Sequence, residues 1–313
     1  MNTLAVVLHA PGELSLSRVA LAPAGEDDVV VETEFSGVST GTERLLWSGR
    51  MPTFPGMGYP LVPGYESVGR VVAAGPRADI RVGARVFVPG ARCYAEVRGL
   101  FGGAAKTLIS PASRVRPVGD LSADSAVLLA LAATARHALA APGAAPPDLI
   151  VGHGVLGRLL ARVAMADGAP APVVWERDPL RRAGADGYSV IDPADDDRRD
   201  YRSIYDVSGD AALINTLIGR LAPGGEIVLA GFYEGDVSFA FAPAFMREAR
   251  LRIAAEWRPA DLAHVQTLIS RGALSLDGLV THRARAESAQ DAYRTAFEDP
   301  RCLKMVLDWR QCS

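Results

Sequence analysis

A glycine-rich turn at residues 152–157 constrains the fold of this 313-residue chain more than any other feature. The short apolar run 149–151 enters the turn, and a segment with helical periodicity, RLLARVAMA, follows it. In this spacing Gly152 permits a tight turn, Gly154 lets the backbone approach a pyrophosphate, and Gly157 lets the helix pack on the strand. The helix N-terminus then presents free N–H groups to the phosphates. The pattern therefore predicts a dinucleotide-binding strand, turn and helix.

An acidic residue after the next apolar run supports this prediction. Glu176 ends the run VVWE, near the offset of about 20 residues at which a carboxylate binds the adenosine ribose hydroxyls. Such a carboxylate repels a 2′-phosphate, so we expect NAD rather than NADP. An ordinary tight turn between buried elements is the alternative. The residues that we expect around the cofactor, besides the three glycines and Glu176, are His153, Val155, Leu156, Arg177, Ser208, Gly231 and Phe232.

Composition narrows the classes of protein that fit. A hydrophobic content of 49% and a charged content of 22% are typical of soluble globular proteins. The net charge of −3, without a basic stripe, argues against a nucleic-acid partner. No apolar run reaches the roughly 18 residues of a membrane-spanning helix, and the N-terminus lacks the features of a signal peptide. The three cysteines are far apart and odd in number, so we expect no disulfide framework and a cytoplasmic location.

The chain divides into three stretches of different pattern. Residues 1–119 are rich in short β-branched runs with turns between them, which predicts a compact β domain. Over residues 120–258 strands and helices alternate, which predicts a doubly wound parallel sheet. Residues 259–313 add two helices and a last strand. The fold class is therefore α/β, with one helix expected from Ser122 to about Ala141 and a solvated loop in the charged run 192–202.

Three short motifs resemble those of the medium-chain dehydrogenase/reductase superfamily. They are PGYESVGRVVAAG, GVSTGTE and LAPGGEIVLAGF, and the resemblance covers nearly the whole chain. It implies a GroES-like β-barrel substrate domain over residues 1–119, completed by 259–313, and a Rossmann domain over 120–258. It also implies a substrate cleft between the two domains and a contact of Lys304 with the cofactor pyrophosphate.

The chain departs from this superfamily at the zinc ligands. Zinc-binding members hold the catalytic ion with a cysteine, a histidine and, as the third ligand, another cysteine or an acidic residue. The resemblance places Ser39 or Thr40, Tyr65 and Ala130 at those positions. Zinc prefers thiolate, imidazole or carboxylate ligands. We therefore expect neither zinc nor any other metal site.

The residues mapped to the metal position are the catalytic candidates. Without zinc, a positioned base or a hydroxyl relay must take the proton of an alcohol. The hydroxyls of Tyr65, Ser39 and Thr40 are expected to orient the substrate oxygen, and Glu66 is expected to be the terminal acceptor. Thr134 maps to the same place. Two alternatives stay open: Glu66 as the structural partner of an arginine, and Tyr65 as a filler of the volume left by histidine and zinc.

Longer stretches are similar to one family within the superfamily, the bacteriochlorophyllide dehydrogenases. They include GTERLLWSGRMPTFPGMGYPLVPGYESVGR, VFVPGARCYAEVRGLFGGAAKTLI and DLIVGHGVLGRLLAR. This resemblance implies NAD-dependent oxidation of the 1-hydroxyethyl group of a magnesium bacteriochlorophyllide to acetyl, in bacteriochlorophyll synthesis. An aromatic and methionine-rich loop suits a flat tetrapyrrole, although ordinary packing of a long loop explains it equally well. The substrate-binding candidates are Trp47, Met51, Phe54, Tyr59 and His137.

Two other functions remain open on the sequence. A zinc-free quinone or enoyl reductase would reduce a conjugated double bond and prefer NADPH, against which Glu176 argues. A non-catalytic NAD(H)-binding protein would use the same fold without turnover, since fold does not fix function. Self-association into a homo-oligomer is also left open.

Overall fold

The computed structural model describes residues 1–53 and 55–312. It divides into two compact units, the first made of Met1–Ala130 with Asp277–Ser313, and the second of Leu131–Leu276. The C-terminal stretch from Asp277 therefore forms one unit with the N-terminal residues. The division differs from the predicted domain boundaries, because residues 120–130 belong to the first unit and residues 259–276 to the second.

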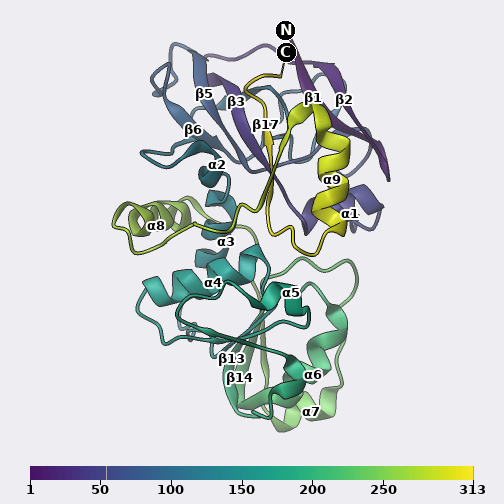
Figure 1. Ribbon diagram of the computed structural model, residues 1–313, viewed down its shortest axis with the longest axis vertical. Helices are drawn as coiled ribbons and strands as arrows, with labels where there is room; N and C mark the ends of the chain where they lie inside the picture. Colours follow the sequence, from purple (N-terminus) through teal and green to yellow (C-terminus); the bar gives the residue numbers. More distant parts are fainter. Residues whose placement is uncertain (54, 313) are drawn as a thin grey trace. The chain divides into compact units, whose positions relative to one another are not determined.

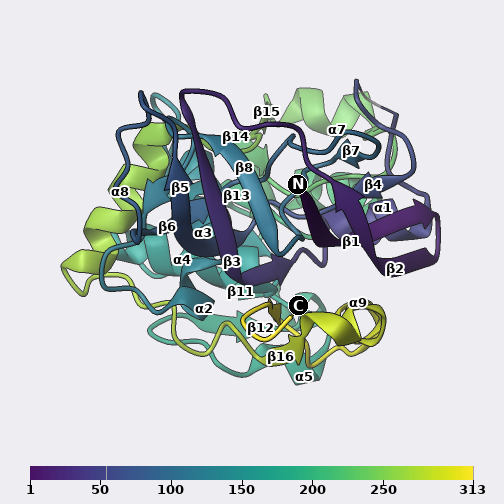
Figure 2. The same ribbon diagram turned by 90° about the horizontal axis from the view of Figure 1, so that it is seen from above.

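The first unit is organised around β3 (Asp28–Val38), which pairs antiparallel with strands from both ends of the chain (Figure 1). Val29 and Val31 on β3 are fully buried, as alternation along a strand with one face in the core requires. Figure 2 shows the C-terminal helix α9 (Ala289–Glu298) beside β16 (His282–Arg285). The other elements of this unit are β1 (Asn2–Ala10), β2 (Glu13–Ala20), α1 (Thr42–Ser48), β4 (Leu61–Val62), β5 (Ser67–Ala74), β6 (Arg85–Val88), β7 (Arg98–Gly99), β8 (Thr107–Pro111), β9 (Arg116–Pro117), α2 (Ala123–Ala126), η3 (Ala286–Ser288) and β17 (Met305–Asp308).

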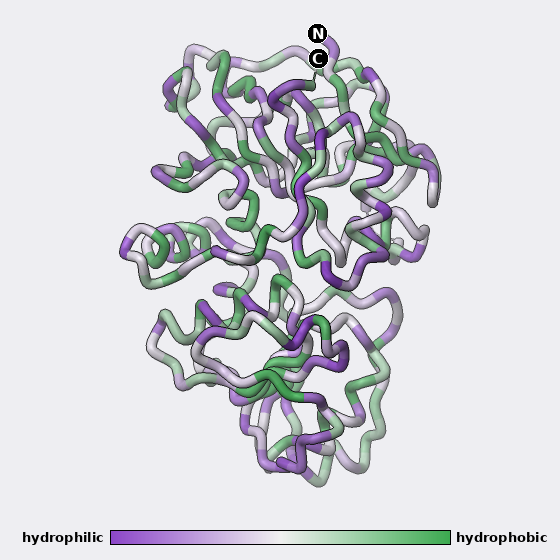
Figure 3. Tube along the Cα trace, viewed as in Figure 1, coloured by the Kyte–Doolittle hydropathy of each residue, from purple (hydrophilic) through white to green (hydrophobic). Residues whose placement is uncertain are grey.

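The second unit is a parallel sheet with the strand order β12-β11-β10-β13-β14-β15. This is the 3-2-1-4-5-6 order of a Rossmann fold, in which the strand order reverses between β10 and β13. The strand β10 is apolar and buried throughout, whereas β13 has the mostly polar sequence YRSIYD and is buried except at Arg202. Figure 3 shows hydrophobic stretches of the trace, in green, within this unit. The elements are β10 (Leu149–Val151), α4 (Val155–Ala166), β11 (Val173–Trp175), α5 (Pro179–Arg182), β12 (Ser189–Ile191), η1 (Pro193–Asp195), β13 (Tyr201–Asp206), η2 (Ala211–Leu213), α6 (Ile214–Arg220), β14 (Leu221–Leu229), α7 (Phe241–Met246), β15 (Arg250–Ile253) and α8 (Pro259–Ser270).

Side-chain contacts explain why α8 belongs to the second unit. Asp261 on α8 lies 2.8 Å from the ring Nδ1 of His137 on α3 (Leu129–Leu139). Shortly after α8, the main-chain oxygen of Ser275 accepts a hydrogen bond from Arg162 on α4 at 3.0 Å. No long-range signal of this kind is visible in a hydrophobic pattern.

Two local predictions were wrong in detail. The helix expected from Ser122 is broken into α2 and α3, and Asp124 on α2 pairs with Arg283 near the C-terminus. The charged run 192–202 is not wholly solvated. Its Asp196 is buried and accepts hydrogen bonds from Trp175 Nε1 and the Tyr201 hydroxyl, both at 2.6 Å. Within the described chain, no helix combines the length and the apolar composition that spanning a bilayer requires.

Candidate functional site

The glycine turn between β10 and α4 has the geometry that its spacing predicts. Gly152 has a φ of +103°, in the left-handed region that favours glycine. A Cβ added to Gly157 would lie 1.9 Å from the main-chain oxygen of Gly152, so only glycine lets the helix approach the strand. Gly154 begins α4 without a side-chain cap, and no described atom lies within 4 Å of an added Cβ. This open helix N-terminus fits a pyrophosphate, because its N–H groups lack helical partners.

The carboxylate of Glu176 is held at this turn by two main-chain donors. The N–H of His153 donates to Oε2 at 3.1 Å, and the N–H of Asp178 donates to Oε1 at 2.9 Å. A carboxylate accepts about four hydrogen bonds in all, and Glu176 is only half-buried. It therefore keeps acceptor capacity for two ribose hydroxyls. Arg177 beside it is exposed, with a guanidinium nitrogen 3.9 Å from Asp210.

His153, one of the residues expected around the cofactor, has its ring enclosed by protein. It is fully buried, with Nδ1 2.7 Å from the main-chain oxygen of Arg181 and Nε2 2.8 Å from the hydroxyl of Tyr188. Burial lowers the pKa of His153 to about 4, so the ring is neutral at neutral pH. Only its main chain contacts Glu176. A contact of His153 with the cofactor would therefore use its main chain rather than its ring.

The strand ends next to the turn carry the other expected cofactor residues. Ser208 is exposed after β13, and Phe232 is 48% exposed after β14. Gly231 lies so close to Gly209 that a Cβ added to Gly231 would be 3.0 Å from the Gly209 nitrogen. These positions follow the carboxyl ends of parallel strands, where open α/β sheets bind ligands. Val155 and Leu156 form the first turn of α4.

Asp206, at the end of β13, was missed from the sequence. It is buried, and burial raises the pKa of its carboxyl group. Its oxygens accept hydrogen bonds from the Ser208 N–H at 2.8 Å and the Tyr233 hydroxyl at 2.9 Å. This carboxylate fixes the loop that carries Ser208. An acid as the last residue of a buried strand is the signal that could have indicated it.

A pair of hydroxyl groups occupies the place mapped to the zinc ligands. The Tyr65 hydroxyl donates to Ser39 Oγ at 2.8 Å, and the N–H of Thr42 donates to the same oxygen at 3.3 Å. Ser39 is buried, whereas Tyr65 and Thr40 are partly exposed. Burial, reinforced by the charge of Glu66, raises the pKa of Tyr65 well above its usual range. The phenol therefore stays protonated at neutral pH, so it is a hydrogen-bond donor there and not a base.

Glu43 holds the main chain of Ser39 and was not among the catalytic candidates proposed from the sequence. Its Oε1 accepts the Ser39 N–H at 3.0 Å, and its Oε2 accepts the hydroxyl of Tyr293 on α9 at 2.6 Å. Burial raises the pKa of Glu43 to about 7, against the lowering effect of these hydrogen bonds. Tyr293 follows Glu43 by 250 residues, so no local pattern in the sequence could join the two.

Glu66 forms a buried ion pair with Lys304. Nζ of Lys304 lies 2.6 Å from Oε2 of Glu66 and donates to the Val38 main-chain oxygen at 3.2 Å. The side chain of Glu66 is 0% exposed and that of Lys304 is 1% exposed. Gly37 makes room for the carboxylate, because an added Cβ would lie 2.1 Å from Oε2. Lys304 thus has two protein acceptors, its expected contact with a pyrophosphate stays a prediction, and the partner of Glu66 is a lysine rather than an arginine.

The residues mapped to the zinc ligands do not fit a zinc ion. Ser39 and Tyr65 offer only hydroxyl groups, which bond to each other, and Ala130 offers a buried methyl group. Zinc sites use thiolate, imidazole or carboxylate groups. Over residues 1–53 and 55–312, no cluster of three or more His, Cys, Asp or Glu side chains is arranged to hold a metal ion.

The aromatic loop packs against the core of the first unit. Met51 is buried, the Trp47 ring lies 5.6 Å from that of Phe297, and the Tyr59 hydroxyl donates to the Leu46 main-chain oxygen. Ordinary packing, the alternative left open above, describes these contacts. Phe54, the remaining loop candidate, lies outside the described residues.

Two further candidates lie on α3, in the second unit. Thr134 is half-buried, and His137 is bonded to Asp261 as described above. His137 is therefore a satisfied side chain, and a contact with the substrate would have to use its other ring nitrogen.

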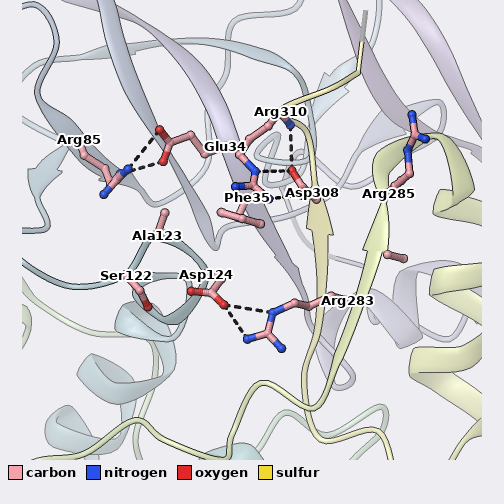
Figure 4. A pocket seen from close by; sticks show the side chains of 11 residues that line it. Glu34, Phe35, Arg85, Ser122, Ala123, Asp124, Arg283, Arg285, Asp308 and Arg310 are labelled. Atoms are coloured by element: carbon pink, nitrogen blue, oxygen red, sulfur yellow. Dashed lines mark hydrogen bonds and ion pairs between the residues drawn. The ribbon is translucent and has the colours of Figure 1, made fainter.

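A cavity of about 660 Å³ in the first unit is unrelated to these residues (Figure 4). Figure 4 shows Arg85 facing Glu34, and Arg283 facing Asp124. Arg310 pairs with Asp308 at 2.7 Å, and Arg285 pairs with Glu287 at 3.3 Å. Because each arginine already has an acidic partner, the cavity offers no free charge to a ligand.

Comparison with known proteins finds relatives that match nearly the whole length of the chain. The alcohol dehydrogenase GroES-like domain matches residues 25–120. The chain is 59% identical over 311 residues to the 2-desacetyl-2-hydroxyethyl bacteriochlorophyllide A dehydrogenase of Rhodobacter capsulatus, covering 99% of both chains. It is 58% identical over 315 residues to the protein of the same name from Cereibacter sphaeroides, again covering 99% of both.

Solved structures share the fold at lower identity. A dehydrogenase from Sinorhizobium meliloti 1021 bound to NADP has a TM-score of 0.80 at 21% identity, covering 98% of this chain and 99% of the other. An alcohol dehydrogenase from Escherichia coli CFT073, complexed with NADH, has a TM-score of 0.83 at 20% identity with the same coverage. The chain therefore belongs to the 2-desacetyl-2-hydroxyethyl bacteriochlorophyllide A dehydrogenase family, within the medium-chain dehydrogenase/reductase superfamily.

Proposed function

We propose that this protein oxidises the 1-hydroxyethyl side group of a magnesium bacteriochlorophyllide to an acetyl group, with NAD as hydride acceptor, in bacteriochlorophyll synthesis. The observation that carries the substrate is the 59% identity over 99% of the chain to a dehydrogenase named for it. The geometry supports the reaction type. The glycine turn with Glu176 suits a dinucleotide, and the Tyr65–Ser39 hydroxyl pair suits an alcohol oxygen.

The hydroxyl pair and its support define the proposed mechanism. A dinucleotide held by Gly152, Gly154 and Glu176 would supply the hydride acceptor for the alcohol carbon. The hydroxyl proton must then leave the oxygen for a positioned group. Tyr65 and Ser39 hold the alcohol oxygen and relay this proton to solvent water, which reaches the partly exposed Tyr65, while Glu43 fixes the Ser39 main chain. We assign the buried Glu66–Lys304 pair a structural role, as a buried support, in place of the terminal acceptor proposed from the sequence.

The direct test is incubation of the purified protein with NAD and the hydroxyethyl bacteriochlorophyllide. We expect one NADH to form for each acetyl product. The product is detected by the change in the absorption spectrum of the pigment and by a molecular mass that is lower by two hydrogen atoms. The corresponding acetyl pigment serves as the control and should give no NADH. NADH binding without turnover would instead indicate a non-catalytic protein, and NADPH-driven reduction of a conjugated double bond would indicate an enoyl reductase.

Cofactor selection is a separate prediction that rests on Glu176. Glu176→Ala removes ribose hydrogen bonds and the repulsion of a 2′-phosphate. Loss of a hydrogen bond to a charged group is worth about tenfold or more in affinity, so we expect the ratio of NAD to NADP in kcat/KM to fall by at least about that factor. Asp236→Ala, at an exposed acid of the same unit, should leave the ratio unchanged. A wild-type protein that uses both cofactors equally would contradict this role.

We infer from the name of the 59% identical relative that the partner is a small tetrapyrrole. We expect no nucleic-acid partner, since the net charge is −3. We also expect a reducing, cytoplasmic environment. Cys93, Cys302 and Cys312 are buried, and within residues 1–53 and 55–312 none of them forms a disulfide bond, which supports that expectation.

A further inference from the structure

The ring of His153 is a buried polar group that the proposed reaction does not use. It lies between two glycines of the nucleotide turn, and both of its nitrogens have partners. Because a carbonyl oxygen only accepts, Nδ1 donates to the Arg181 main-chain oxygen, and Nε2 accepts from the Tyr188 hydroxyl. The rings of His153 and Tyr188 meet edge to face, with centroids 5.6 Å apart. A side chain that only filled space would not need both hydrogen bonds.

Both partners of His153 belong to one stretch of chain. We call residues 179–188, which contain α5 and lead into β12, the α5 segment. None of the residues of α5 is buried. The α5 segment is therefore held mainly by polar contacts rather than by a hydrophobic core.

Arg158 on α4 also binds the α5 segment. Its guanidinium donates to the main-chain oxygens of Arg181, Ala183 and Gly184 at 2.9, 2.7 and 3.1 Å. Its Nε donates to the main-chain oxygen of His153 at 3.0 Å. Arg158 and the His153 ring thus converge on the Arg181 carbonyl.

The Glu176 carboxylate is part of the same network. It accepts the His153 N–H at 3.1 Å, while Arg182 of the α5 segment donates to the Glu176 main-chain oxygen at 2.8 Å. The glycine turn, the carboxylate and the α5 segment therefore form one hydrogen-bonded group, and His153 takes part through its main chain and its ring.

We propose that His153 is a positioning residue for nucleotide selection. By fastening the α5 segment to the glycine turn, it holds the Glu176 carboxylate where the adenosine ribose hydroxyls bind. This inference rests on the proposed NAD-dependent function. Small displacements of a positioning group are costly, so release of the α5 segment weakens NAD binding without touching the reacting atoms.

The test compares variants of His153 and its partner in the full-length protein. Kd for NADH and NADPH is measured by fluorescence, and kcat and KM are measured with NAD, after circular dichroism has shown each variant to be folded. His153→Ala removes both ring hydrogen bonds, and we expect NADH to bind about three- to tenfold more weakly, a factor of the size that one hydrogen bond contributes in net terms. Its kcat at saturating NAD should stay at the wild-type value. Tyr188→Phe should shift Kd in the same direction by less.

Two further variants separate positioning from general destabilisation. His153→Asn keeps a donor for the Arg181 carbonyl and should recover part of the affinity. His264→Ala removes another histidine of the second unit, one that pairs with Asp167 at 2.7 Å, and should bind NADH like the wild type. A folded His153→Ala with wild-type affinity and selectivity would overturn this inference alone. Failure of the wild type to bind NADH or NADPH would overturn the proposed function with it.

Discussion

Lys304→Met is expected to lower the free energy of unfolding by about 3–5 kcal/mol, the usual cost of breaking a buried ion pair from one side. The substitution leaves the Glu66 carboxylate buried with its cation removed. Its other oxygen, Oε1, has no hydrogen-bond partner among the described residues, so no second donor would take over. Urea denaturation followed by fluorescence measures the loss.

Two comparisons isolate the pair. Arg294→Met removes an arginine that pairs with Asp291 at 3.6 Å, with both side chains more than half exposed, and it should cost at most about 1 kcal/mol, as expected for a surface pair. Adding Glu66→Gln to Lys304→Met removes the stranded charge and should recover much of the loss. If Lys304→Met were as stable as the wild type, the Glu66–Lys304 pair would not be the buried support described above.

Ser39→Ala is expected to reduce kcat by about 10²–10⁴-fold, the range contributed by positioned proton-transfer groups. It removes the hydroxyl to which Tyr65 donates at 2.8 Å. Tyr65→Phe should lose less, because water can replace a relay hydroxyl at a partly exposed position. Turnover of the bacteriochlorophyllide with NAD measures both effects, and NADH binding should be retained in both variants.

Matched substitutions elsewhere in the first unit control for loss of a hydroxyl. Ser48→Ala removes a serine that donates to the Leu45 main-chain oxygen at 3.3 Å, and Tyr94→Phe removes a tyrosine that donates to Gly102 at 2.6 Å. Neither should change kcat. Wild-type turnover in both Ser39→Ala and Tyr65→Phe would mean that the proton leaves by another route, for which His137 is the next candidate.

The parts of this account that the sequence predicted depend on local patterns. Gly152, Gly154 and Gly157 take the conformations that their spacing requires, because the steric demands of the turn act over a few residues. The alternation of strands and helices likewise predicted the parallel sheet of the second unit. The resemblance brought Ser39 and Tyr65 to one place, and the structure joins them by a hydrogen bond.

The parts that failed depend on pairs far apart in the chain. Glu66 meets Lys304 across 238 residues, and Glu43 meets Tyr293 across 250. His153 turns inward because Arg181 and Tyr188 offer partners that no periodicity announces. Such polar contacts are set by tertiary structure, so the sequence identified the residue types without their partners.

The central claim is that a hydroxyl pair performs an alcohol oxidation for which other members of the superfamily use zinc. The most direct measurement is the metal content of the active protein, determined together with its turnover of the bacteriochlorophyllide by NAD with and without a chelator. The account predicts zinc far below one ion per chain and turnover that the chelator leaves unchanged. Stoichiometric zinc together with chelator-sensitive turnover would contradict it.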